Sequence, residues 1–161
     1  MKKWERFFLF FGRISLALVF IMLSINRILN WEESERILLA AFGDWLSFFN
    51  NAFMQRTISF FMEWVGAFLL LIIFFESISG IFLFFGKKIR LAAFILSITL
   101  FFTNFIYNPF WMMNNDKWEN HMIVFLRNIA VLGGLFYIFV YGKEKKKDKK
   151  MELSSSVIGK K

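Results

Sequence analysis

The chain has 161 residues, of which 58% are hydrophobic and 25 are Phe, and it carries a formal net charge of +8. A soluble domain is about half apolar, so this composition excludes an ordinary soluble globular protein. The chain has no cysteine and one histidine, which excludes disulfides, cysteine-ligated clusters and a bis-histidine haem within it.

Four apolar stretches account for most of the chain, at residues 7–29, 60–85, 89–107 and 122–141. Each is long enough to cross a bilayer, because a spanning helix needs about 20 mostly apolar residues. The sequence therefore predicts an all-α integral membrane four-helix bundle, folded as one transmembrane domain over residues 1–142. Residues 143–161 are rich in lysine and are predicted to form a basic, disordered cytoplasmic tail.

The distribution of positive charge predicts the orientation in the membrane. Fourteen Lys and Arg residues lie before the first span, between the second and third spans, or after the fourth, and three lie in the other two connections. Cytoplasmic loops carry the excess of Lys and Arg, so the N- and C-termini are both predicted to be cytoplasmic. This orientation explains the basic charge, so membrane lipids and not nucleic acid are the expected surroundings.

The connection between the first two spans contains an amphipathic pattern at residues 35–49. Apolar residues such as Leu38, Phe42 and Trp45 recur there at spacings of three and four. The pattern predicts an external amphipathic helix that lies flat on the outer leaflet or folds over the mouth of the bundle. A lipid-resting cover and a substrate gate are both consistent with it.

Charged side chains inside the first two spans are predicted to form an ion pair. The first span carries a helical stripe with an arginine near each end: Arg13, Ala17, Phe20, Ser24 and Arg27. The second carries Glu76 near the middle of the membrane, where an unpaired carboxylate is costly. At 1.5 Å per residue the depths of Arg13 and Glu76 differ by about 5 Å, which predicts that these two residues pair. Arg27 is expected to reach the outer interface.

Polar side chains in the outer half of the membrane predict a pocket that opens outward. Its candidate ligand-binding residues are Arg127, Asn128, Asn104, Arg27, Glu63 and His121. The alternative is structural, because interhelical hydrogen bonds hold bundles together without chemistry. The sequence has no metal motif, nucleophile triad, phosphate loop or dinucleotide fingerprint. No metal site is therefore expected, and redox chemistry requires a diffusible carrier such as quinone.

Three stretches of the chain carry recognisable motifs. They are Arg13–Phe20 with Ser24-Ile-Asn-Arg27, then Glu76-x3-Gly80-x5-Gly86 with Arg90-Leu-Ala-Ala, and finally Phe110-Trp111 with Leu126-Arg127-Asn128-Ile-Ala-Val-Leu-Gly133-Gly134. In this order they resemble the DoxX family of small four-helix membrane proteins. The resemblance implies a bacterial cytoplasmic membrane and an association with redox systems. That family is also similar to eukaryotic Surfeit-locus cargo receptors of the early secretory pathway.

The expected function is that of a small accessory or quinone-linked subunit of a membrane redox complex, at most an oxidoreductase subunit without its own metal or haem. In this hypothesis Arg127, Asn128 and Asn104 hydrogen-bond a quinone head group, and Glu76 handles the accompanying proton. The expected partner of this protein is then a redox subunit.

Two alternatives remain. In the first, the protein is a non-enzymatic adaptor that recognises an envelope protein, another cargo or a lipid through the groove under the 35–49 helix. In the second, it forms a small-molecule or proton pathway.

Overall fold

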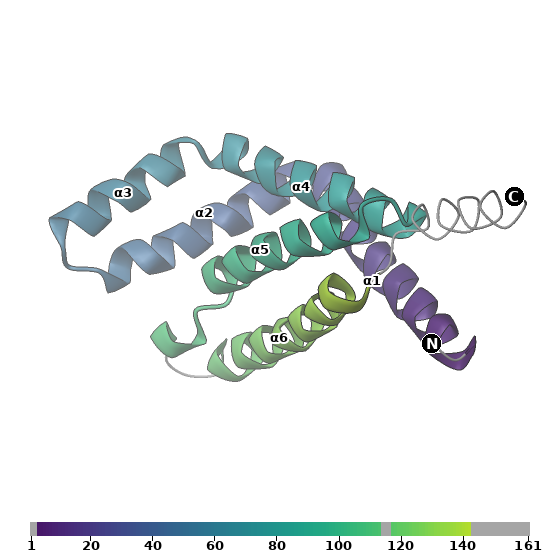
Figure 1. Ribbon diagram of the computed structural model, residues 1–161. Helices are drawn as coiled ribbons and strands as arrows, with labels where there is room; N and C mark the ends of the chain where they lie inside the picture. The colour runs from purple at the N-terminus through teal and green to yellow at the C-terminus, as the bar shows by residue number, and fades with distance from the viewer. Residues whose placement is uncertain (1–2, 114–116, 143–161) are drawn as a thin grey trace, which may run out of the picture.

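The computed structural model describes residues 3–113 and 117–142, and every regular element in these two ranges is a helix. The elements in chain order are α1 (Lys3–Leu29), α2 (Trp31–Phe48), α3 (Ala52–Glu63), α4 (Val65–Phe85), α5 (Ile89–Tyr107), the short 3-10 helix η1 (Phe110–Met112) and α6 (Lys117–Tyr141). Figure 1 shows that they form an elongated bundle. The predicted all-α class is confirmed, and the predicted tail at 143–161 lies outside the described residues.

Within the described ranges, four helical segments are long and apolar enough to cross a membrane. They are Phe7–Leu29, Val65–Phe85, Ile89–Met112 and Trp118–Tyr141. The predicted membrane four-helix bundle is therefore confirmed. The second span begins at Val65 and not at residue 60, because the helix is interrupted at Trp64, whose backbone (φ −106°, ψ 24°) departs from α-helical geometry.

The central helix of the bundle is α4, which packs against α1 and against α5, while α6 packs on α5. Helix α1 contributes Ala17, Phe20 and Ser24, each at most 2% exposed, which confirms the predicted stripe. Gly80 allows α1 and α4 to approach closely, because a Cβ at this position would lie 3.1 Å from Cγ1 of Ile21. Small residues at such contacts are typical of helices that pack within membranes.

A tight turn joins α4 to α5 and makes these helices neighbours, as predicted. Gly86 adopts the left-handed conformation (φ 72°) that closes many helices, and glycine adopts it without steric cost. The N–H of Gly86 donates to the carbonyl of Leu83 (3.3 Å), and the N–H of Lys87 donates to that of Phe82 (3.0 Å). These bonds satisfy carbonyl groups at the end of α4 that have no partner inside the helix.

The connection between the first two spans is a hairpin of two helices, α2 and α3. Helix α2 confirms the helix predicted at residues 35–49, and α3 is an additional helix. A single residue, Asn30, separates α1 from α2, and α2 packs against α4 and α5. Its buried residues are Leu38, Ala41 and Phe42. The indole Nε1 of Trp45 donates to the carbonyl of Ile106 (3.3 Å), which fixes α2 to the end of α5.

Helix α3 was not predicted, and its last four residues, 60–63, were assigned to the second span. Asn51 is its N-cap, and the Asn51 side chain accepts a hydrogen bond from the N–H of Phe53 (3.0 Å). No residue of α3 is buried. In Figure 1 the α2–α3 hairpin extends from the end of the bundle that lies opposite the α4–α5 turn, and α3 is bent relative to α4.

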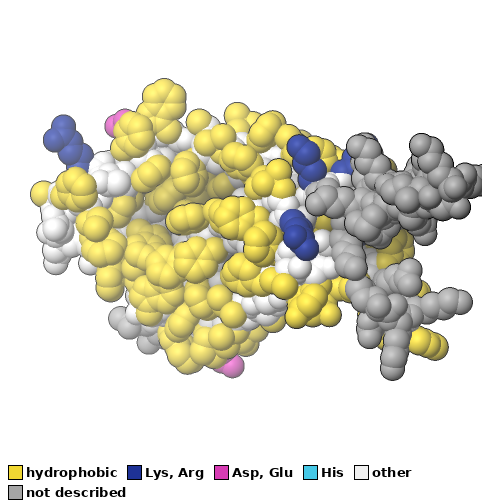
Figure 2. All heavy atoms as spheres, viewed as in Figure 1, with side chains coloured by type: hydrophobic (Ala, Val, Ile, Leu, Met, Phe, Trp, Pro, Cys, Tyr) yellow, Lys and Arg dark blue, Asp and Glu magenta, His cyan; other side chains and the backbone are white. Residues whose placement is uncertain are grey.

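Apolar side chains dominate the surface. Figure 2 shows them over most of the visible face, with Lys and Arg toward its two ends. Exposed aromatic residues occur along all four spans, for example Phe11, Phe74, Phe102 and Phe136. Water would solvate such a surface poorly, whereas lipid chains match it.

The bundle geometry generates a test of the predicted orientation. Because the chain has no cysteine, single substitutions Asn50→Cys and Lys87→Cys place one thiol at each end of the molecule, in exposed positions. In sealed vesicles of known sidedness, we expect a membrane-impermeant maleimide to label position 50 from the non-cytoplasmic side only. Position 87 should be labelled from the cytoplasmic side only. The cysteine-free parent is the control, and the reverse pattern would show that both termini are non-cytoplasmic.

Candidate functional site

The most buried charged residue in the described part of the chain is Glu76 on α4, whose side chain is 1% exposed. Its Oε2 accepts a hydrogen bond from Nη1 of Arg27 on α1, and the two side chains form an ion pair. The Arg27 side chain is 18% exposed, and its guanidinium carbon lies 5.9 Å from the ring centre of Tyr107 on α5. An unpaired carboxylate within a membrane span is costly, and Arg27 provides a cationic partner. The cluster therefore connects α1, α4 and α5.

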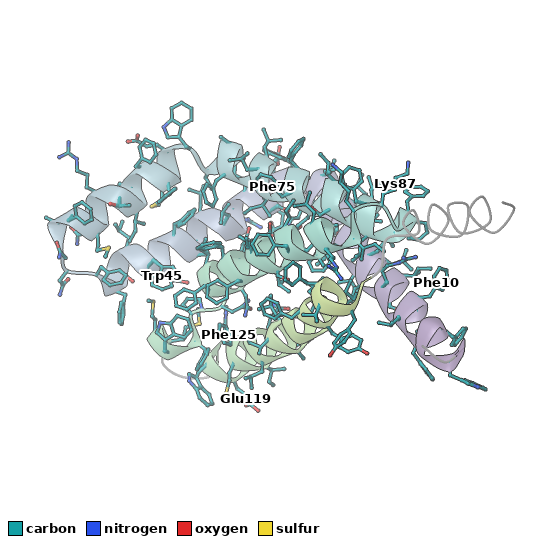
Figure 3. All side chains as sticks on the ribbon, in the orientation of Figure 1. Phe10, Trp45, Phe75, Lys87, Glu119 and Phe125 are labelled. Carbon is teal, nitrogen blue, oxygen red and sulfur yellow. The ribbon has the colours of Figure 1, made fainter. Side chains whose placement is uncertain are left out.

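The predicted pairing of Arg13 with Glu76 is wrong. Arg13 lies instead against the turn after α4, where a Cβ on Gly86 would come 2.9 Å from Nη1 of Arg13. Arg13 is about 21 Å from Arg27 along α1 at 1.5 Å per residue, and the antiparallel helix α4 brings Glu76 near the later arginine. The predicted depth of Arg13 was measured from residue 7, the start of the first apolar stretch. In Figure 1 the first part of α1, where Figure 3 labels Phe10, diverges from the bundle, so depth along α1 does not match depth along α4.

Three asparagine side chains form a second polar cluster, between α5 and α6. Oδ1 of Asn104 accepts hydrogen bonds from Nδ2 of Asn128 (2.8 Å) and from Nδ2 of Asn108 (3.2 Å). Nδ2 of Asn104 donates to the carbonyl of Phe125 (3.3 Å). The predicted proximity of Asn104 and Asn128 is confirmed. Each of these hydrogen bonds joins two groups of the chain itself, so the cluster holds α5 against α6.

The other predicted ligand-binding residues do not join this cluster. Arg127 precedes Asn128 by one residue, about 100° around the helix, and it is exposed. Glu63 is exposed at the end of α3, and His121 is half-buried at the start of α6. Arg27 belongs to the Glu76 cluster. The structure thus divides the predicted pocket into separate groups, and ligand binding by these residues stays a prediction.

An aromatic cluster that the sequence did not indicate covers the hairpin end of the bundle. Trp45 of α2 stacks on Phe105 of α5 (ring centres 5.7 Å apart), and Phe105 contacts Trp111 of η1 (4.8 Å). Trp111 meets Phe125 of α6 edge to face (5.8 Å). Figure 3 labels Trp45 and Phe125 at this end. Aromatic residues that end membrane spans could have suggested the cluster, because Trp and Tyr gather at interfaces.

A further contact joins the hairpin to α4. Oε1 of Glu35 on α2 lies 3.3 Å from the position that a Cβ on Gly66 would occupy, and the Trp31 indole is 3.9 Å from the same point. Gly66 therefore leaves room for these side chains at the junction of the hairpin and the spans.

In the described residues, no three His, Cys, Asp or Glu side chains gather in a way that could hold a metal ion.

We expect the Arg27–Glu76 pair to show strong energetic coupling. Glu76→Gln and Arg27→Gln should each lower the free energy of unfolding by about 1–3 kcal/mol, because each leaves a buried group without its partner. The double variant should lose less than the sum. Unfolding in mixed micelles, titrated with denaturing detergent, measures the three values.

The matched control for this cycle is Arg13→Gln combined with Glu76→Gln. Arg13 makes no contact with Glu76, so these two effects should add within about 0.5 kcal/mol. Coupling of Glu76 to Arg13 and not to Arg27 would contradict the observed pairing.

The asparagine cluster gives a second stability prediction. Asn104→Ala removes the acceptor shared by Asn108 and Asn128, and leaves two amide donors unpaired. We expect a loss of about 1–2 kcal/mol in the same unfolding experiment. Asn120→Ala, an exposed position on α6, is the control and should change stability by less than about 0.5 kcal/mol. Equal effects of the two substitutions would show that the cluster does not stabilise the bundle.

Comparison with protein families identifies a different relationship from the one that the motifs indicated. The family model of the SURF4 family matches residues 32–150, which is more than half of the chain, from the start of α2 through α6. No curated protein sequence and no solved structure matches the chain.

The resemblance to the DoxX family was therefore wrong. Its motifs consist of small residues, single charges and aromatic residues, which helical membrane bundles in general use for close packing and for anchoring at the interface. Such residues identify the type of bundle better than they identify a family. The chain is a multi-pass membrane protein with four candidate membrane-spanning helices, and it belongs to the SURF4 family.

Proposed function

We propose that this protein is a non-enzymatic membrane adaptor that binds a partner polypeptide through the α2–α3 hairpin. The observation that carries the proposal is the row of exposed aromatic side chains on α3. Phe53 is 73% exposed, Phe60 57%, and Trp64, directly after the helix, 60%. Spacings of seven and four residues place them on one side of the helix. The row is therefore an exposed aromatic surface, and the exposed polar residues Arg56 and Thr57 lie between Phe53 and Phe60 on the same side.

Helix length supports a position of this surface beyond the lipid hydrocarbon. Helix α4 has 21 residues, and at 1.5 Å each it alone fills the core of about 30 Å. The 12 residues of α3 add about 18 Å and extend away from α4 in Figure 1. Phe53, at the far end of α3, then lies well outside the core. An apolar surface in that position favours a protein partner over lipid chains.

The stability of α3 supports the same proposal. An isolated helix of fewer than about 12–15 residues is marginal in water, and α3 has 12 residues with none buried. A partner that covers the aromatic row would stabilise it. A partner polypeptide that matches this row has apolar side chains that cover the aromatic rings and a carboxylate that pairs with Arg56.

The redox alternative has no comparable support. Its quinone head-group site required Arg127, Asn128 and Asn104 together, but Arg127 is exposed and the two amides bond to each other. The carboxylate assigned to proton handling, Glu76, is held by Arg27. The predicted bacterial cytoplasmic membrane rested on the DoxX resemblance, and the proposal does not depend on it.

Photo-crosslinking tests the proposal. A photoreactive amino acid at position 53 or 60 should crosslink to a polypeptide in native membranes, whereas at position 74, on α4, it should crosslink to lipid. Phe74 is the matched control because its exposed fraction, 56%, is close to that of Phe60. Mass spectrometry identifies the products. Lipid products alone at positions 53 and 60 would contradict the proposal, since the hairpin would then rest on the membrane.

Substitution gives the corresponding affinity measurement. Aromatic residues at the centre of an interface often contribute 2 kcal/mol or more, so Phe53→Ala with Phe60→Ala should weaken capture of the crosslinked partner at least about tenfold. Phe74→Ala should leave capture unchanged. Equal capture of the partner by all variants would show that α3 is not part of the binding interface.

A further inference from the structure

An apolar groove of about 600 Å³ runs between α5 and α6 on the outer surface of the bundle. Its lining includes Phe94, Ser97 and Phe101 of α5 and Ile129, Gly133 and Phe136 of α6. The hydroxyl of Ser97 donates to the carbonyl of Ala93 (2.8 Å), so even this polar residue is satisfied within α5. The groove consequently offers an almost entirely apolar surface to whatever fills it.

Gly133 creates this space. A Cβ at Gly133 would have no atom within 4 Å, so the missing side chain does not serve close packing within the chain. Its neighbour Gly134 is different, because a Cβ there would lie 3.3 Å from Cδ1 of Leu16 on α1. Of the two adjacent glycines, one therefore faces the interior and the other opens the groove to the outside.

The groove begins on the side of the α4–α5 turn and reaches the middle of the membrane. On α5 it extends from Phe94 to Phe102, about 8–20 Å beyond Ile89 at 1.5 Å per residue. On α6 it extends from Phe136 back to Ile129, about 8–18 Å from the end of the helix at Tyr141. Half of a hydrocarbon core is about 15 Å thick. A lipid chain that starts at the level of Arg90 and fills the groove therefore spans the leaflet on the side of the α4–α5 turn and ends near the middle of the membrane.

Positive charge lies at the end of the groove nearest that turn. Arg90 precedes Phe94 by four residues, which puts both on one face of α5. Its Nε donates to the carbonyl of Gly142 (3.2 Å), so the guanidinium is held across the end of α6. Arg90 is exposed, and an arginine has five N–H donors, so donors remain for an anion. Exposed Lys87 and Lys88 add charge in the same turn.

We infer that this groove binds one acyl chain of an anionic phospholipid whose phosphate contacts Arg90. A guanidinium at head-group depth above an apolar channel one leaflet deep matches both ends of such a molecule. A free phosphate would contact only Arg90, and an uncharged lipid would contact only the groove. The inference is independent of the α2–α3 hairpin, which lies at the other end of the bundle (Figure 1).

The experiment is native mass spectrometry of the protein released from nanodiscs that contain equal amounts of phosphatidylglycerol and phosphatidylcholine. The parent chain should retain one phosphatidylglycerol in preference to phosphatidylcholine. Gly133→Leu fills the groove and should reduce this retained lipid at least tenfold. Gly12→Leu is the control, because Gly12 is also a helical glycine with open space around its Cβ position, and it should retain the lipid.

Arg90→Gln tests the head-group contact separately. It should abolish the preference for phosphatidylglycerol, while Arg90→Lys, which keeps the charge, should preserve most of it. Retention of the lipid by Gly133→Leu would overturn the inference. So would a parent that leaves the nanodisc as a dimer and becomes a monomer on this substitution, because the groove would then bind a second copy. Binding of inorganic phosphate that competes fully with the lipid would likewise show that the groove does not contribute.

Discussion

The ion pair between Arg27 and Glu76 is the constraint on which the rest of this structure depends. A carboxylate inside a membrane span is costly, so α4 requires a cation at that depth, and α1 provides it near its end. The pair lies close to Asn30, where α1 gives way to α2. Fixing α1 against α4 at this level also fixes where α2 begins, and so how it packs across the ends of α4 and α5.

The interior polar groups of the bundle are used between helices. Glu76 bonds Arg27, and Asn104 accepts from both Asn108 and Asn128. In lipid there is no water to satisfy such groups, so their mutual bonds hold the helices in register. Glu76, Asn104 and Asn128 thus bond to other helices of the bundle, and ligand binding by these residues stays a prediction.

Two outer surfaces differ in solvent and therefore in expected partner. We proposed that the aromatic row on α3 lies beyond the length of a membrane span, where exposed phenylalanines favour contact with protein. The groove opened by Gly133 lies within the spans, where lipid chains are the natural occupants.

The sequence by itself determined the four spans, the α1 stripe and the approach of Asn104 to Asn128, because hydrophobic length and helical spacing are local properties of the chain. Only the tertiary structure decided that Glu76 pairs with Arg27, since two arginines fourteen residues apart fit the same stripe and helix tilt determines their depth. The hairpin also needed the fold: only the break in helical geometry at Trp64 separates α3 from the second span, and the apolar residues run on across it. Depth, tilt and pairing arise from packing between helices, which no single segment encodes.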